Sequence, residues 1–209
     1  MCDQMETLTG TPLDIGVSRW ALTNSQECGD AHLVSVGAKS VLIAVLDGLG
    51  HGPDAAAATR AALNVMGRHP DDDLVALLRR CHVAASGTRG IVMSLARFDW
   101  ERGSLAWVGV GNVQGILIRG DDRAAKPREH LIPGHGLVGY RLPFVTLAVR
   151  PFIEGDFLVM STDGVGPGIA EEPVPRLPAK DVAEQLVERF ATRKDDALVL
   201  AVRYDRPER

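Results

Sequence analysis

The chain has 209 residues, 45% of them hydrophobic and 24% charged, and a formal net charge of -4 at pH 7. This length suits one sizeable core, so we expect a single compact domain over residues 1–209 with a core from about 14 to 204. The acidic balance, without any Lys/Arg cluster, argues against nucleic acid as a partner, because phosphate backbones require concentrated positive charge.

The cysteines and the apolar runs indicate the compartment. Cys2, Cys28 and Cys81 are odd in number and lack the paired spacing of a zinc site or a disulfide framework. No apolar run approaches the roughly 18 residues of a membrane span, and the first residues lack the pattern of a signal peptide. We therefore expect a cytoplasmic monomer that makes no membrane contact.

The first half of the chain predicts strands followed by helices. Alternating apolar and polar residues indicate half-buried strands at 14–22 and 31–37, while the wholly apolar run 40–47 indicates a central strand buried on both faces. A helix is expected from Pro53 to about Met66. A second helix follows within 71–86, where three leading aspartates complement the helix dipole. Its apolar face consists of Leu74, Leu77, Leu78, Cys81 and Ala85.

The second half reads mainly as an antiparallel β series for which hairpins are the natural connections. Residues 120–129 are expected to form a charged hairpin loop, 132–143 a structured loop and 166–178 a proline-spaced loop. The expected strands are 91–99, 104–112, 113–120, 145–149, 155–164 and 197–205, and the expected helix is 179–191. This order favours two stacked antiparallel sheets with helices on their outer faces over a parallel doubly wound sheet.

The turn after the central strand raises a question about charge. Asp47 is followed by Gly48, Gly50 and Gly52, in front of a predicted helix. Such a turn resembles a phosphate cradle, but a carboxylate at its mouth repels phosphate unless a cation lies between them. The turn also lacks the Gly-Lys-Ser/Thr ending and the dinucleotide spacing. A metal site is therefore the working hypothesis, beside an ordinary tight turn whose aspartate helps to cap the helix.

Other aspartates stand at strand ends in the same way. Asp163 and Gly164 follow an apolar strand, Asp30 begins the second strand, and Asp195 and Asp196 directly precede the last one. A single aspartate beside a glycine is often only turn chemistry. Several together, with almost no His or Cys nearby, indicate Mg²⁺ or Mn²⁺ completed by water, since zinc calls for nitrogen or sulfur ligands.

The motifs ECGD, LDGLGHG, GVGN, STDG and KDDALVL, in this order, resemble those of the metal-dependent protein phosphatases, the PPM or type 2C family. The resemblance covers residues 14–204. The D-G-x-G-x-G form and the compact chain are similar to the bacterial SpoIIE-type branch, and GHGLVGYRLP resembles a loop of stressosome feedback phosphatases. The resemblance implies an α+β fold, a four-layer α-β-β-α sandwich of two antiparallel sheets flanked by helices.

The resemblance also implies a site with two Mn²⁺ or Mg²⁺ ions. In it Asp47 bridges the ions, the Gly48 carbonyl binds one of them, and a metal-activated water attacks phosphorus. The implied catalytic residues are Asp47, Asp163 and Asp195. The implied metal ligands are Asp30, Asp47, Gly48, Asp163, Asp195 and, in a supporting part, Asp196. Further supporting residues are Glu27, His51 and Asn112.

Two positions depart from the eukaryotic form of the family. Leu49 stands where those members often carry a histidine that serves as a candidate general acid, and the nearest substitute is His51. Ordering the turn is the better expectation for His51, and a surface role for His135. No arginine directly precedes ECGD, where eukaryotic members bind the substrate phosphate. The sequence thus leaves the leaving-group acid and the phosphate-binding cation unassigned.

Three functions of different classes remain to be weighed. The leading hypothesis is a serine/threonine phosphatase acting on a phosphorylated protein, with the STAS domain of a stressosome scaffold as the expected partner. The alternative is a catalytically inactive module that keeps the fold and only binds a partner, which predicts missing carboxylates. A nucleotide-binding enzyme is the third, and Asp47 and the absent lysine of a phosphate loop argue against it.

Overall fold

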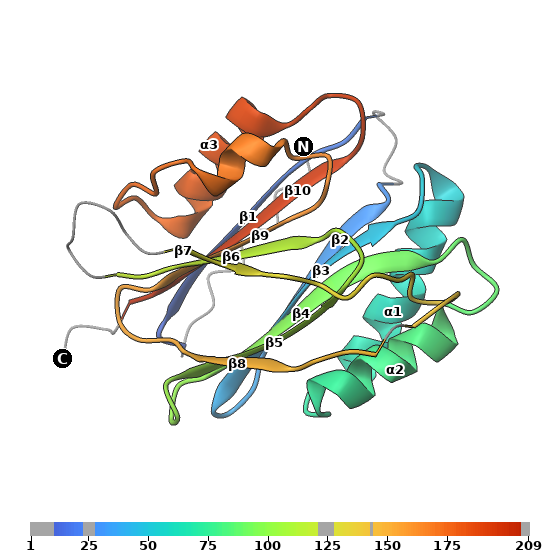
Figure 1. The fold of residues 1–209 in the computed structure, drawn as a ribbon, viewed down its shortest axis with the longest axis horizontal. Coiled ribbons are helices and arrows are strands. Elements are labelled where there is room, and N and C mark those ends of the chain that lie inside the picture. The colour runs from blue at the N-terminus through green and yellow to red at the C-terminus, as the bar shows by residue number, and fades with distance from the viewer. Residues whose placement is uncertain (1–10, 23–27, 121–127, 143, 206–209) are drawn as a thin grey trace.

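Two five-stranded antiparallel sheets stack face to face in the computed structural model, which describes residues 11–22, 28–120, 128–142 and 144–205 (Figure 1). Sheet A has the order β1-β10-β9-β6-β7, and sheet B the order β2-β3-β4-β5-β8. The strands of sheet A are β1 Leu13–Trp20, β10 Ala197–Tyr204, β9 Phe157–Ser161, β6 Gln114–Ile118 and β7 Arg128–Leu131. Those of sheet B are β2 Asp30–Val36, β3 Ser40–Gly48, β4 Ile91–Asp99, β5 Ser104–Val110 and β8 Ala148–Pro151.

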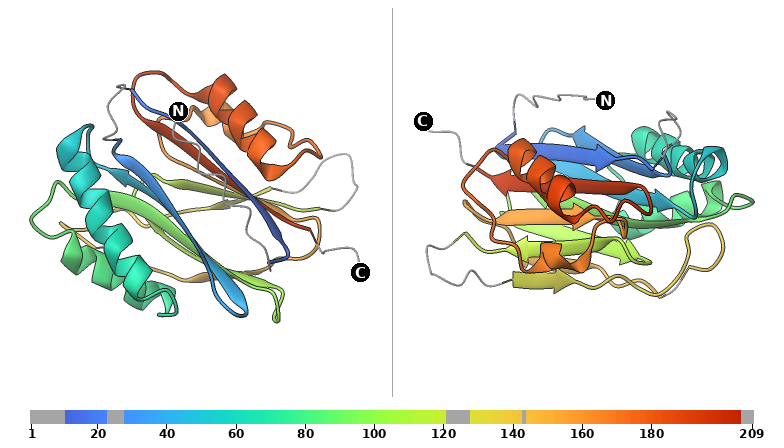
Figure 2. Two further views of the ribbon diagram at one scale, coloured as in Figure 1. Left: turned by 180° about the vertical axis from the view of Figure 1, so that it is seen from behind. Right: turned by 90° about the horizontal axis from the view of Figure 1, so that it is seen from above.

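Helices cover the two outer faces of the stacked sheets. The helices α1 (Pro53–Arg68) and α2 (Leu74–Ala84) pack on sheet B, while α3 (Ala179–Phe190) and the short 3₁₀ helix η1 (Pro167–Ala170) lie over sheet A. Figure 2 shows the resulting four layers from two further directions. The predicted α+β fold with its α-β-β-α layering is therefore confirmed.

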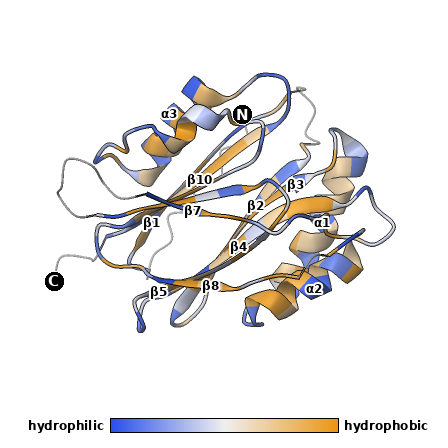
Figure 3. Cartoon of the chain, viewed as in Figure 1, coloured by the Kyte–Doolittle hydropathy of each residue, from blue (hydrophilic) through white to orange (hydrophobic). Residues whose placement is uncertain are grey.

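The central strand β3 shows why this stacking is stable. Its residues alternate between two cores: Val41, Ile43 and Val45 point into the core between the sheets, and Leu42 and Ala44 face the core under α1 and α2. All five are at most 2% exposed. Burial on both faces requires the continuous apolar run seen in the sequence. Figure 3 shows the central strands largely in the hydrophobic colour, whereas the helices alternate between hydrophobic and hydrophilic residues.

The helix α2 also follows its sequence signals. Its predicted apolar residues Leu74, Leu77, Leu78 and Cys81 are all buried. Asp73 is the N-cap, and its carboxylate accepts hydrogen bonds from the backbone N–H groups of two first-turn residues at 2.9 and 3.1 Å. One of the three leading aspartates thus satisfies free amides at the helix start, which stabilises this end of the helix.

One connection and the bounds of one strand differ from the sequence prediction. Strands β5 and β6 do not form a hairpin, because β6 lies in sheet A between β7 and β9. The chain crosses between the sheets at Gly111, whose φ is 97° and whose missing Cβ would lie 2.1 Å from Val92 Cγ1. The strand expected at 145–149 begins later, as β8, because only Ala148–Pro151 pairs with β5.

The remaining expectations on connections and cysteines are met where the structure describes them, except that the loop expected at 166–178 contains the short helix η1. β6 and β7 pair as the hairpin expected around 120–129, and β7 already starts within that range. Cys81 is buried and Cys28 partly exposed, and both are free thiols, while Cys2 lies outside the described residues. Among the described residues, no helix has the length and apolar character needed to cross a membrane.

Candidate active site

The aspartates singled out in the sequence meet at one end of the sandwich. Asp30 and Asp47 are direct partners across the β2–β3 ladder in sheet B. Asp163 and Asp195 lie at the edge of sheet A, Asp163 shortly after β9 and Asp195 shortly before β10. A hydrogen bond of 2.7 Å from Thr162 Oγ1 to Asp30 Oδ2 joins the two sheets at this point. Residues far apart in the sequence are brought together because antiparallel strands start and end at the same edge.

A pocket of about 100 Å³ opens between these segments. Three of the aspartates, Asp47, Asp163 and Asp195, lie in its wall. The other lining residues are Leu49, Gly50, Val92 and Asn112. The wall therefore combines both sheets with the turn after β3, and no described basic side chain belongs to it.

Burial and mutual repulsion dominate the electrostatics of the pocket. Burial first, and then the charges of neighbouring aspartates, raise the pKa of Asp47 to about 8. Burial also raises the pKa of Asp30 to about 7, against the hydrogen bond from Thr162. The pKa of Asp163 is raised by burial and by Asp195, while Asn112 opposes the shift. A cation stabilises carboxylates in such surroundings, because its positive charge attracts them and offsets their mutual repulsion.

The donor set fits a hard divalent cation in its chemistry. It offers carboxylate oxygens from several segments and neither thiolate nor imidazole at the pocket wall, as Mg²⁺ and Mn²⁺ prefer. In their present rotamers no three described His, Cys, Asp or Glu side chains are arranged to hold an ion.

Thr162 is a residue of this site that sequence reasoning missed. It is 1% exposed, and its hydroxyl accepts a hydrogen bond from the Leu198 N–H at 2.9 Å while donating to Asp30. The hydroxyl thereby fixes the Asp30 carboxylate relative to the start of β10. The only sequence signal was its place in the STDG motif, one residue before Asp163.

The neighbours Asp195 and Asp196 have different surroundings. Asp195 lines the pocket, whereas Asp196 is only 6% exposed. The two carboxylate oxygens of Asp196 accept hydrogen bonds from the backbone N–H groups of Leu22 and Gly29, each at 2.9 Å. The Asp196 N–H in turn donates to Asp195 Oδ1 at 2.9 Å. Asp196 thus ties the segment ahead of Asp30 to the loop that carries Asp195.

The glycines directly after two of the strand-end aspartates, Gly48 and Gly164, allow close backbone packing beside the pocket. A Cβ on Gly48 would lie 2.4 Å from the Ala55 carbonyl oxygen of α1, and one on Gly164 would lie 1.8 Å from the Asp196 carbonyl oxygen. Close backbone packing occupies that space, so these glycines bring α1 and the Asp196 loop against the pocket.

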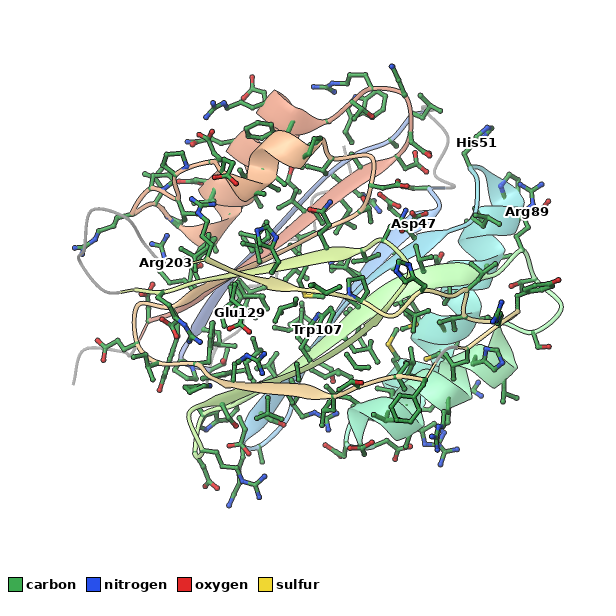
Figure 4. The ribbon with its side chains drawn as sticks, viewed as in Figure 1. Asp47, His51, Arg89, Trp107, Glu129 and Arg203 are labelled. Carbon is green, nitrogen blue, oxygen red and sulfur yellow. The ribbon has the colours of Figure 1, made fainter. Side chains whose placement is uncertain are left out.

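The supporting residues are spread unevenly around the pocket. Asn112 lines it and donates from Nδ2 to Asp163 Oδ2 at 2.7 Å. His51 is exposed at the tip of the turn after β3, and Figure 4 shows it projecting outward from Asp47. His135 is also exposed, on the loop after β7. Glu27 lies outside the described residues.

Comparison with known proteins identifies the fold and the family. A family model described as Stage II sporulation protein E (SpoIIE) matches residues 37–205, well over half of the chain. The chain belongs to the SpoIIE family. This SpoIIE-family chain is 24% identical over 170 residues to the phosphoserine phosphatase RsbX of Bacillus subtilis (strain 168), a match that covers 81% of the chain and 83% of RsbX.

Two solved structures extend the likeness to three dimensions. One, described as "The bacterial stressosome: a modular system that has been adapted to control secondary messenger signaling", has a TM-score of 0.80 and 31% identity, and the match covers 91% of the SpoIIE-family chain and 99% of the other. The second is RsbX in complex with magnesium, with a TM-score of 0.80 and 21% identity, covering 91% and 94% of the two chains.

These matches confirm the resemblance drawn from the five motifs. The SpoIIE-family chain is a phosphatase of the type 2C class, and its two stacked sheets have the fold of the RsbX structure. The carboxylate pocket lies at the end of the sandwich where those motifs converge, since Asp30, Asp47, Asn112, Asp163 and Asp195 each come from a different one of them.

Proposed function

We propose that the chain hydrolyses phosphoserine and phosphothreonine in a phosphorylated protein through two Mn²⁺ or Mg²⁺ ions bound by its aspartates. The observation that carries this proposal is the crowding of Asp47, Asp163 and Asp195 around one pocket without a basic side chain in its described wall. Their proximity leaves negative charge that divalent cations neutralise. Burial and repulsion raise the pKa of Asp47 and Asp163, which supports the same assignment.

Each carboxylate has a place in this proposal. Asp47, Asp163 and Asp195, together with the Gly48 carbonyl, would hold one ion. Asp47 and Asp30 would hold the other, Asp30 directly or through water. When bound, the ion pair supplies an acidified water and offsets negative charge on the phosphoryl oxygens.

The surrounding residues hold these carboxylates in position. The Asn112 amide orients Asp163, and the Thr162 hydroxyl orients Asp30. Asp196 supports the site from outside the pocket wall. Its oxygens accept hydrogen bonds from the Leu22 and Gly29 amides, and its own N–H donates to the Asp195 carboxylate. Such supporting hydrogen bonds fix the direction of metal ligands and tune their basicity.

The reaction exchanges one oxygen on phosphorus for another. The bond from phosphorus to the serine or threonine oxygen breaks, and a bond to the water oxygen forms, which releases inorganic phosphate and the free hydroxyl. A covalent phosphoenzyme is not required, and neither Cys28 nor Cys81 lines the pocket. Since His51 projects into solvent, we assign the proton taken up by the leaving oxygen to solvent water.

The proposed substrate is the phosphorylated STAS domain of a stressosome scaffold, and dephosphorylation would reset the stress signal. Two findings support this choice: RsbX is a phosphoserine phosphatase, and the structure with 31% identity comes from a study of the bacterial stressosome. The pocket is small, at about 100 Å³, which suits a phosphate group presented on a protein surface better than a large free metabolite.

Phosphate release from phosphoserine STAS domains and phosphoserine peptides, with Mn²⁺ or Mg²⁺ present, tests the proposal. We expect release by the wild-type chain, loss of release on chelation, and a drop of about a thousandfold or more in Asp47→Ala, since the site supplies several kcal/mol of charge stabilisation. Asp181→Asn, an exposed aspartate in the first turn of α3, is the matched control and should keep full activity.

The same preparation separates the proposal from the inactive interaction module. Calorimetric titration with Mn²⁺ should show binding that Asp47→Ala removes. Activity that survives both chelation and Asp47→Ala would contradict the metal mechanism. Absence of Mn²⁺ binding together with absence of phosphate release would favour the module instead.

A further inference from the structure

Arg89 lies against the edge of the carboxylate pocket. Its Nη1 atom is 3.2 Å from the point where a Cβ on Gly50 would lie, and Gly50 lines the pocket. The next residue along, Gly90, accepts a hydrogen bond from the Leu49 N–H at 3.1 Å. The segment before β4 that carries Arg89 is therefore bound to the turn that forms the pocket rim. Figure 4 shows Arg89 at the same edge of the molecule as Asp47 and His51.

The pocket itself does not attract an anion through its described side chains. Its lining has three aspartates and an asparagine, and no described Lys, Arg or His. In the proposed mechanism the bound ions would attract the phosphoryl oxygens, but no described side chain of the wall adds positive charge for a phosphate monoester, which carries up to two negative charges. A fixed cation at the rim supplies such a charge and raises the local concentration of the anion.

The side chain of Arg89 is held in place but remains available. Its Nη2 atom is 2.8 Å from Asp54 Oδ2 at the start of α1, and the two side chains are 50% and 68% exposed. An ion pair this exposed contributes little to stability and exchanges readily for a stronger anion. Its guanidinium has five N–H donors in a planar fork, so it can bind two phosphate oxygens while Asp54 keeps its position.

We propose that Arg89 binds the phosphate group of the substrate at the rim of the pocket and so determines substrate affinity. This inference rests on the proposed phosphatase function and assigns the cation that the sequence leaves open. The ligand class is a phosphate monoester, with inorganic phosphate as the product that occupies the same place. Arg89 acts on binding, while the aspartates act on the chemical step.

Arg193 and Lys194, the basic residues closest to Asp195 in the sequence, are weaker choices for this role. The Arg193 guanidinium lies over the Trp20 ring, 4.9 Å from its centroid. Lys194 precedes Asp195 and is exposed, and it presents a single ammonium group rather than a fork. Lys194 is therefore the comparison residue in the test.

Steady-state kinetics of Arg89→Ala, Arg89→Gln and Arg89→Lys with a phosphoserine peptide and Mn²⁺ tests the proposal. We expect KM to rise about tenfold or more in Arg89→Ala and Arg89→Gln, as for a lost charge-assisted hydrogen bond, with kcat within about threefold of wild type. Arg89→Lys should restore part of the affinity. The inhibition constant of inorganic phosphate should rise in parallel with KM.

Arg80→Ala is the matched control, because Arg80 forms a similar surface pair with Asp72, at 2.6 Å and 52% exposure, from α2. It should leave KM and the phosphate inhibition constant unchanged. A calorimetric titration of the Mn²⁺-loaded protein with inorganic phosphate gives a second readout that needs no turnover, and Arg89→Ala should weaken this binding by about tenfold or more.

The outcomes separate this inference from the proposed function. Wild-type activity with unchanged KM and phosphate binding in every Arg89 variant would overturn the inference and leave the phosphatase mechanism standing. A rise of KM in Lys194→Ala but not in Arg89→Ala would also overturn it. A wild-type chain that neither releases nor binds phosphate would overturn both.

Discussion

The two ends of the sandwich each bury an aspartate, and they treat its charge in opposite ways. Asp156, at the start of β9, is 0% exposed and is fully partnered. Its oxygens accept hydrogen bonds from the Gly120 and Ile153 amides at 2.9 and 3.1 Å and from Arg119 Nη1 at 2.9 Å. Glu129 extends the cluster by pairing with Arg119 and Arg150, and Figure 4 shows it at the end opposite to Asp47.

At the other end, Asp47 has no hydrogen-bond donor among the described residues, and its leading electrostatic neighbours are other aspartates. Asp30 has a hydroxyl partner, Thr162, but no arginine that resembles Arg119. The difference shows that the fold can neutralise a buried carboxylate when that carboxylate is structural. The crowded carboxylates at the β3 end, which lack such a partner, support the cation site proposed above.

The largest expected effect on stability comes from removing the Asp156 carboxylate, which is fully hydrogen-bonded. Asp156→Ala leaves Arg119 without its buried partner and two amides without an acceptor, so we expect a loss of about 3 kcal/mol or more in the free energy of unfolding. Urea unfolding measures this, with Asp181→Asn as the surface control. A loss below about 0.5 kcal/mol, the range of ordinary surface changes, would show that the partners of Asp156 do not stabilise the fold and that the two ends do not differ in this respect.

Divalent metal should stabilise the other end. Because Mn²⁺ binds only the folded site, saturation at about 100 times its dissociation constant should add about 2.7 kcal/mol to the free energy of unfolding. The increase should vanish in Asp47→Ala and persist in Asp156→Ala. Thermal unfolding with Mn²⁺ and with chelator measures it, and an equal shift in Asp47→Ala would place the ion elsewhere.

Removing the Thr162 hydroxyl should have a smaller effect on the same site. Thr162→Val keeps the shape but leaves Asp30 and the Leu198 amide without their partner, so we expect Mn²⁺ affinity to fall by about 10- to 100-fold. Thr162→Ser keeps the hydroxyl and is the matched control. Calorimetric titration distinguishes the two, and identical affinities would show that Asp30 needs no orientation.

The smallest expected effect is an increase, not a loss, in the free energy of unfolding. Asp47→Asn removes a partly buried charge that has no partner among the described residues, so in chelator at pH 8 we expect the metal-free chain to gain about 1 kcal/mol in the free energy of unfolding. The same substitution should abolish phosphate release. A destabilised Asp47→Asn variant would mean that the carboxylate has a structural role like that of Asp156.

Local patterns explain why much of the fold could be predicted. The strand β3 is determined by a continuous apolar run and the helix α2 by an apolar period of 3.6 residues, and both signals act within one segment. The crossing at Gly111 could not be predicted in this way. It depends on the approach of Gly111 to Val92 in a neighbouring strand, and a hairpin suits the same local sequence equally well.

The candidate site also has features that local sequence predicts and features that depend on tertiary contacts. The sequence by itself determined which carboxylates stand at strand ends and which cation chemistry they suit, because each signal lies within a few residues. Only the tertiary structure decided that Thr162 holds Asp30, that Asp196 faces backbone amides and that Arg89 reaches the rim. These contacts join segments distant in the chain, and their geometry arises only when both sheets are packed.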